Sequence, residues 1–73
     1  MEIMTSVQIS GQKLYQKRLE RLWSRRELAS NAGLTEDHIG KLERVENTRA
    51  HMQTIRKLVD ALECAPADIT AEK

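Results

Sequence analysis

Residues 33 to 44 read GLTEDHIGKLER, and this stretch predicts a sharp turn followed by a helix. Gly33 can adopt the left-handed backbone conformation that a tight turn between two helices needs. Thr35 is a favoured helix N-cap residue, and Ile39 and Leu42 recur at helical spacing. We therefore expect a helix that begins after Thr35, with Ile39 and Leu42 facing the core.

The residues before this turn predict a second helix. Ser24, Arg25, Arg26 and Glu27 form a capping-box sequence, in which each of the two outer side chains accepts from the backbone amide of the other residue. The pattern ends at Ala32. Two short helices joined by a glycine-containing turn are typical of a helix-turn-helix, whose second helix lies in the major groove of DNA.

The rest of the chain predicts three more helices. The first covers about residues 12–21, with an apolar stripe of Leu14, Tyr15, Leu19 and Leu22. Another covers residues 52–62, with Met52, Ile55, Leu58, Val59 and Leu62 on one face. Pro66 opens a last short helix, because proline suits the first helical position, and Ile69 packs inward.

Two segments predict no helix. Residues 45–51 show no clear period and predict a loop. Residues 1–10 alternate loosely, with Ile3, Thr5, Val7 and Ile9 on one side, which predicts a weak strand or an ordered arm. We expect an all-α, compact five-helix domain over residues 11–70, preceded by the arm at 1–10 and followed by a tail at 71–73.

Composition limits the class of protein. The chain has 73 residues, of which 40% are hydrophobic and 32% charged, so it predicts one small globular domain. Its one cysteine, Cys64, excludes an internal disulfide framework and a cysteine-rich zinc site, and we expect it to be a buried, inert thiol. Nothing resembles a membrane span or a signal peptide. His38 and His51 lack a ligand cluster, so we expect no metal, no cofactor and no enzymatic activity.

The charge is distributed unevenly along the chain. The net charge is +1. Residues 11–26 contain six cations and one acid, whereas acids outnumber cations beyond Val59. This asymmetry indicates a phosphate-facing side. A solvated helix with many charges explains the same pattern equally well.

The complete pattern resembles the phage Cro and lambda-repressor type of helix-turn-helix domain, also called XRE-like. The resemblance rests on Gly11 and Leu14, on residues 24–29 and 32–35, on Ile39, and on residues 41–44, 54–58, 61–62 and 66–69. It implies a lambda-repressor-like fold that binds a double-stranded DNA operator, usually as a homodimer on two half-sites. It also implies a cytoplasmic, nucleoid-associated location and no membrane partner.

The resemblance assigns roles to individual residues. It places base contacts at Glu36, Asp37 and Lys41. It places phosphate contacts at the starts of the two helices and beyond the second one, namely at Ser24, Arg25, Arg26, Thr35, Arg44 and Arg49. It also implies an internal salt bridge between Arg18 and Glu43.

Glu36 and Asp37 are unusual for a helix that enters DNA, since carboxylates repel phosphates. Acids in a first helical turn are favoured by the helix dipole. A carboxylate can also accept from the exocyclic amine of cytosine. The third alternative is that the acids keep DNA away. Lys41 can pair with Asp37 one turn away or donate to guanine.

Besides Glu36 and Asp37, three positions depart from the family pattern, namely Leu22, Trp23 and Val45. Leu22 and Val45 stand where glycine commonly ends a helix, so the chain after Val45 is expected to be longer or irregular. Trp23 replaces a smaller residue and is expected to fill the core. Gly40, in mid-helix, costs about 0.5–1 kcal/mol relative to alanine, which indicates a close backbone approach to DNA or to another helix.

These features predict a sequence-specific DNA-binding transcriptional regulator, a repressor, with basic residues of the first helix contributing to phosphate binding. The competing hypothesis is a protein-interaction module on the same fold, such as an antitoxin, an anti-activator or an adaptor. We expect a dimer interface on the last two helices and the arm, where Val7 and Ile9 add a strand across the two-fold axis.

Overall fold

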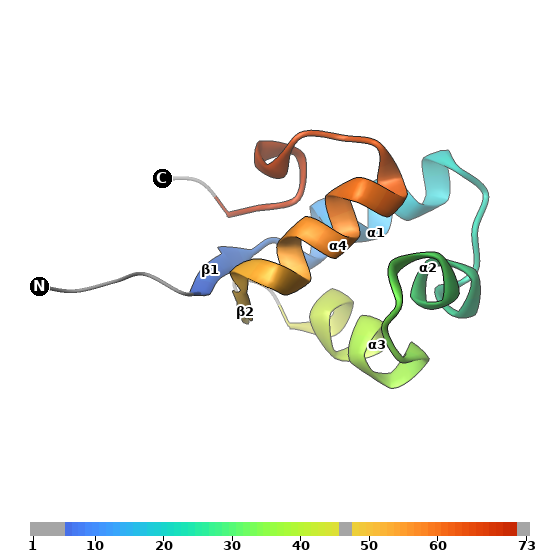
Figure 1. The fold of residues 1–73 in the computed structure, drawn as a ribbon, viewed down its shortest axis with the longest axis horizontal. Helices are drawn as coiled ribbons and strands as arrows, with labels where there is room; N and C mark the ends of the chain where they lie inside the picture. Colours follow the sequence, from blue (N-terminus) through green and yellow to red (C-terminus); the bar gives the residue numbers. More distant parts are fainter. Residues whose placement is uncertain (1–5, 46–47, 72–73) are drawn as a thin grey trace, which may run out of the picture.

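The computed structural model describes residues 6–45 and 48–71, and within them four α-helices, two strands and one 3-10 turn (Figure 1). In chain order these are β1 (Ser6–Ile9), α1 (Gly11–Glu20), α2 (Arg25–Ala32), α3 (Glu36–Arg44), β2 (Thr48–His51), α4 (Met52–Leu62) and η1 (Pro66–Asp68). The expectations for residues 1–5, including Ile3 and Thr5, and for 72–73 lie outside the described residues.

The helix starts follow from local capping. The Ser24 hydroxyl accepts from the amide of Glu27 at 3.1 Å, and the Glu27 carboxylate accepts from the amide of Ser24 at 2.7 Å, so the predicted capping box is confirmed. At the start of α3 the Thr35 side chain accepts from the amide of His38. Gly33 ends α2 in the left-handed conformation, with φ 72°. Each of these contacts lies within three residues of the helix end, where a sequence pattern is most informative.

The predicted five-helix count is wrong, because Pro66–Asp68 forms only a 3-10 turn. The Asp68 carboxylate accepts from the amide of Ala65 at 3.0 Å, which closes the turn on itself. Thr70 then forms a bridge with Ile9, so the chain is extended two residues later. No room remains for a regular fifth helix.

The all-α class and the predicted loop at 45–51 are also corrected, because β1 and β2 form a small antiparallel sheet. Val7 pairs with Ala50, which is 5% exposed. On the other side of β1, Gln8 accepts from the amide of Ala71 at 2.9 Å, and Ile9 pairs with Thr70. Gln8 and Ile9 therefore have backbone partners on both sides of β1 within their own chain.

The core is aliphatic, as the composition predicts. Its fully buried side chains are Ile9, Leu14, Leu28, Ile39, Leu58 and Ile69. On α1, however, only Leu14 of the predicted apolar stripe is buried; Tyr15 and Leu19 are over 40% exposed, and Leu22 is 89% exposed. Arg18 takes the buried position one turn after Leu14.

Two of the family departures have structural consequences. Leu22 has φ 59°, the left-handed conformation that glycine adopts without strain. Trp23 packs against the core from a partly buried position, with the Arg21 guanidinium 5.4 Å from its ring centroid. Val45 is extended and exposed, and α3 ends at Arg44.

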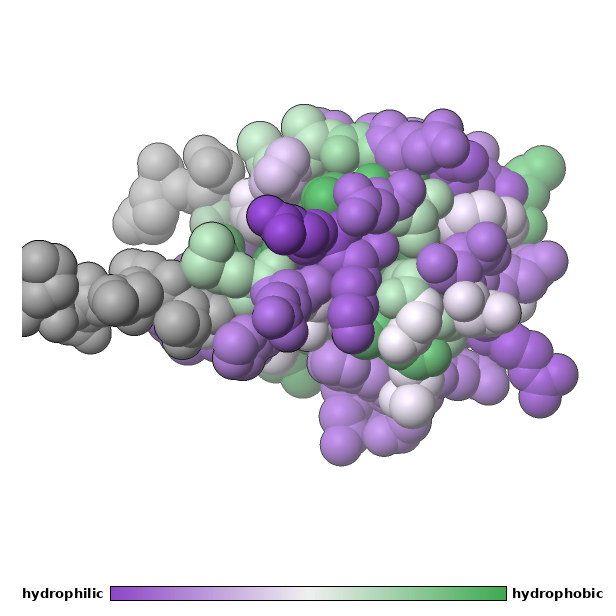
Figure 2. All heavy atoms as spheres, in the orientation of Figure 1, coloured by the Kyte–Doolittle hydropathy of each residue, from purple (hydrophilic) through white to green (hydrophobic). Residues whose placement is uncertain are grey.

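The outer surface is dominated by polar side chains. On the face drawn in Figure 2, hydrophilic residues cover most of the area and apolar residues form small patches between them. Within residues 6–45 and 48–71, no helix combines the length and the apolar character that crossing a membrane requires.

Candidate nucleic-acid interface

Helix α3 is attached to the domain by one face and leaves the other free. Ile39 and Leu42 are buried, whereas Glu36, Asp37 and Lys41 are exposed. The side chain of Thr35 accepts from the amide of His38 at 3.1 Å, which holds the first turn. The three residues that the resemblance assigns to base contacts therefore lie together on the outward side of one rigid helix.

The position of α3 depends on a close approach to α1. A Cβ atom on Gly11 would lie 2.6 Å from the carbonyl oxygen of Glu43 and 2.7 Å from that of Leu42. Real Cβ atoms do not come this close to backbone atoms. The first turn of α1 is thus packed directly on the last turn of α3, and this contact requires glycine.

The ion pair between Arg18 and Glu43 is present, and it includes a third member that the sequence did not reveal. Glu43 accepts from Nε of Arg18 at 2.6 Å and from Nη2 of Arg18 at 3.1 Å, with its side chain only 1% exposed. Its Oε1 also accepts from Nε of Arg25 at 3.1 Å. The hydrogen bond to Glu43 raises the pKa of Arg18 above its ordinary value. Two arginines thus share one buried carboxylate.

Arg25 consequently lies against α3. Its side chain remains 42% exposed while its Nε is bound to Glu43. Its Nη1 and that of Arg44 would lie 3.7 and 4.0 Å from a Cβ atom on Gly40. Among the described residues, no neighbouring helix backbone lies within 4 Å of that point, so the expected close approach of another helix to Gly40 is wrong.

The two acids in the first turn of α3 each have a cation nearby. Glu36 lies 3.9 Å from Nε of Arg26, and Asp37 lies 3.6 Å from Nζ of Lys41 one turn along the helix. All four side chains are more than half exposed, so each pair contributes only about 0–1 kcal/mol to stability. The two ion pairs matter for the local charge, because the nearby cations offset the two carboxylates and the start of α3 does not form a negative patch.

The remaining predicted contact residues are distributed around this surface. The Ser24 hydroxyl is used in the capping box at the start of α2. Arg44 is exposed at the end of α3. Arg49 is exposed on β2, where its Nε donates to the Ser6 hydroxyl at 3.2 Å.

The cations of α1 do not join this surface as the charge pattern predicted. Lys13 donates to the carbonyl of Thr70 at 3.1 Å, and Arg21 donates to that of Leu62 at 3.1 Å. Lys17 pairs with Glu20 at 3.3 Å, and Arg18 is buried. Three of these cations therefore contact the C-terminal segment or the interior and Lys17 pairs within α1, contacts that the distribution of charge along the sequence does not reveal.

The comparison with known families agrees with this geometry. Residues 13–71 match the Cro/C1-type helix-turn-helix DNA-binding domain. The chain belongs to this family. No curated protein sequence shows significant similarity to this chain.

Three solved structures of two proteins illustrate the family fold. The restriction-modification controller protein C.AhdI from Aeromonas hydrophila is 31% identical, with a TM-score of 0.72 over 80% of this chain and 86% of that one. The N-terminal DNA-binding domain of the master biofilm regulator SinR from Bacillus subtilis is 30% identical, with a TM-score of 0.76 over 88% and 93%. A crystal structure of SinR in complex with DNA matches with a TM-score of 0.74 and 30% identity over 78% and 90%.

Two further features of this Cro/C1-type domain concern Cys64 and metal binding. Cys64 is partly buried and packs against the core, and burial raises the pKa of its thiol, with the charge of Asp68 acting in the same direction. Among the described residues, no group of three His, Cys, Asp or Glu side chains is placed to hold a metal ion.

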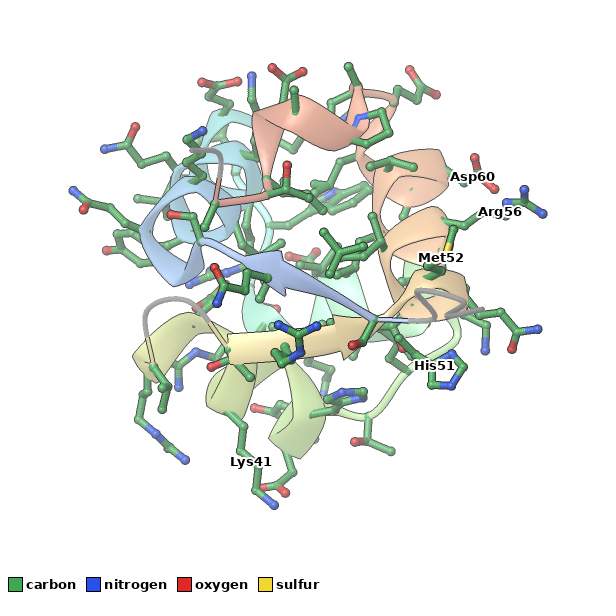
Figure 3. The ribbon with its side chains drawn as sticks, turned by 90° about the vertical axis from the view of Figure 1, so that its left-hand side faces the viewer. Lys41, His51, Met52, Arg56 and Asp60 are labelled. Atoms are coloured by element: carbon green, nitrogen blue, oxygen red, sulfur yellow. The ribbon has the colours of Figure 1, made fainter. Side chains whose placement is uncertain are left out.

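The exposed surface of α4 is a second candidate interface. Met52, Arg56 and Asp60 follow one edge of the helix and point outward, well away from Lys41 on α3 (Figure 3). They border a hollow of about 730 Å³ that also includes Val7 and Val59. The sequence placed Met52 on the inward face, yet it is 52% exposed.

Proposed function

We propose that the protein is a sequence-specific DNA-binding transcriptional regulator that places α3 in the major groove. The observation that carries the proposal is the free surface of α3, with Glu36, Asp37 and Lys41 outward, beside the arginine-bearing start of α2. The DNA complex of SinR, a structural relative, supports the same use of the fold. The proposed activity is binding, without catalysis.

Phosphate contacts are assigned to residues around α3. They are Ser24, Arg26, Thr35, Arg44 and Arg49. The resemblance also assigns a phosphate contact to Arg25, but the hydrogen bond from Arg25 to Glu43 holds that side chain against α3. Cations that neutralise phosphates release counterions, so affinity for DNA should fall steeply and linearly with salt on a double-logarithmic plot.

We assign base contacts to Glu36, Asp37 and Lys41. Carboxylates accept from N4 of cytosine, and lysine donates to O6 and N7 of guanine. Repulsion of phosphates by the two acids is offset by Arg26 and Lys41, each within 4 Å of a carboxylate. The acids therefore favour particular base pairs without preventing the approach of DNA.

The decisive experiment is an unbiased selection of bound sequences from random duplex DNA, followed by anisotropy titrations at several salt concentrations. A defined operator motif with a salt-dependent Kd supports the proposal. The double variant Glu36→Gln with Asp37→Asn should alter preference at one or two base pairs. If its affinity rises equally for all sequences, the acids repel DNA, and the protein-interaction alternative gains support.

Repression is proposed as the direct result of operator binding, which blocks access of polymerase to a promoter. A reporter gene placed behind the selected operator should decrease in expression when the protein is present. Increased expression would instead identify an activator.

We also propose a homodimer through the exposed edge of α4. Arg56 and Asp60 stand one turn apart beside an apolar hollow. In an isologous contact between antiparallel α4 helices, Arg56 of each copy would face Asp60 of the other. This edge is distinct from the side of Lys41, so both interfaces can be occupied together (Figure 3).

The charges provide the test of the dimer. Arg56→Asp alone and Asp60→Arg alone each place like charges across the two-fold axis and should give monomers by light scattering. The double charge swap should restore the dimer. A wild-type chain that stays monomeric at high concentration removes the proposal.

A further inference from the structure

The hollow beside Gly40 has a mixed polar lining. Arg25 and Arg44 supply donors, Glu36 and Asp37 supply acceptors, and the volume is about 310 Å³. It is open because residue 40 has no side chain, and a Cβ atom there would contact both guanidinium groups. The lining therefore presents cations and carboxylates to one small space on the outward surface of α3.

A phosphate does not suit this lining. It offers acceptors alone, so it would leave the carboxylate oxygens of Glu36 and Asp37 without a donor. The major-groove edge of a G·C pair offers both kinds of group, since guanine accepts at O6 and N7 and cytosine donates from N4. We infer that Arg25, together with Glu36 and Asp37, forms a recognition site for the edge of one G·C base pair. This inference rests on the proposed DNA-binding function.

Arg25 is held in an orientation that suits this role. Its Nε donates to Oε1 of Glu43 at 3.1 Å, and Glu43 is fixed in turn by the two bonds from Arg18. Because Nε is occupied, the two terminal Nη groups form the free end of the fork. An arginine fork is the side chain best suited to two parallel hydrogen bonds with guanine.

Charge supports the same conclusion. Arg18 already matches the buried charge of Glu43, so the charge of Arg25 is left for an external acceptor. Glu43 is thus a positioning residue that acts through Arg25. The assignment differs from the phosphate contact that family resemblance gives to residue 25, and it makes Arg25 a determinant of specificity.

The inference is tested by selecting bound sequences from random duplex DNA with the full wild-type chain and with Arg25→Lys and Arg21→Lys. Lysine keeps the charge but removes both the bond to Glu43 and the fork. Wild type should select G·C at one fixed position of each half-site. Arg25→Lys should lose preference at that position by about 5- to 150-fold, the range for one bidentate contact. Its salt dependence should stay close to that of wild type.

Arg21→Lys is the matched control, because Arg21 is also an arginine but donates to Leu62 and Glu63 rather than to Glu43. Its preference should remain that of wild type. Gly40→Leu is a second variant that fills the hollow while Arg25 keeps its guanidinium group, and it should weaken the same base preference. Thermal unfolding checks that each variant is folded.

Three outcomes would overturn the inference. If Arg25→Lys reduces affinity equally for all sequences, Arg25 contacts phosphate, and the proposed function stands without this site. If the preference is unchanged in Arg25→Lys and in Gly40→Leu, the hollow does not recognise a base. If wild type selects no DNA at all, the proposed function fails together with the inference.

Discussion

Replacing Gly11 by alanine tests the packing that holds α3 in place. The new Cβ atom would lie 2.6 and 2.7 Å from two carbonyl oxygens of α3, whereas ordinary contacts begin at 3.4 Å. The two helices must therefore separate by about 0.7–0.8 Å at this point. Overpacking of this kind typically costs about 1–3 kcal/mol, and alanine recovers about 0.5–1 kcal/mol of helix propensity.

We expect a net loss of about 1–2 kcal/mol in the free energy of unfolding, which lowers Tm by roughly 4–15 °C in a domain of this size. Urea and thermal unfolding monitored by circular dichroism measure both quantities. Because the displaced turn of α3 includes Glu43, affinity for the operator should decrease as well.

Gly40→Ala is the matched control. Its Cβ atom meets only the flexible ends of Arg25 and Arg44, at 3.7 and 4.0 Å. This variant should therefore gain about 0.5–1 kcal/mol from helix propensity. The reasoning is refuted if Gly11→Ala is as stable as wild type, or if both variants lose stability equally.

Three further predictions concern single positions. Leu22→Gly should raise the free energy of unfolding by about 0.5–1 kcal/mol in urea titrations, because Leu22 is exposed and has φ 59°; a loss would show that its side chain packs. Glu43→Gln should cost about 3–5 kcal/mol, because it leaves Arg18 buried without a counter-charge, whereas Glu20→Gln at an exposed pair should be nearly neutral. Burial raises the pKa of the Cys64 thiol, so at pH 8 this thiol should react with iodoacetamide more slowly in the folded chain than in the urea-unfolded chain; equal rates would contradict this. Because the folded state holds the thiol proton more tightly, the free energy of unfolding should also decline as the pH rises from the pKa of the unfolded thiol to that of the folded one.

The elements that the sequence predicted well are those determined by neighbouring residues. The capping box at Ser24, the cap at Thr35 and the left-handed Gly33 each involve contacts within a few positions. The helix starts and the turn of the helix-turn-helix follow directly. The outward residues of α3 follow as well, because burial of Ile39 and Leu42 determines which side remains exposed.

The features that were missed depend on distant residues. Thr48–His51 has no strand pattern of its own and becomes a strand because Ser6–Ile9 lies beside it. Arg18 occupies a core position only because Glu43 neutralises it there, so an apolar stripe through Leu19 was the wrong expectation. The third member of that ion cluster, Arg25, lies 18 positions from Glu43, beyond the reach of any local pattern.

The placement of β1 between β2 and residues 69–71 has a consequence for folding order. The amide of Ser10 donates to Ile69, and that of Ala71 donates to Gln8, so the first described strand and the last described residues protect one another. These amides should exchange with solvent only when the whole domain opens, at the slow rate of the central helices. During synthesis, this edge of β1 can form only after about sixty further residues have been added, so a chain truncated after α4 should be cleaved by protease within Ser6–Ile9 more readily than the full chain.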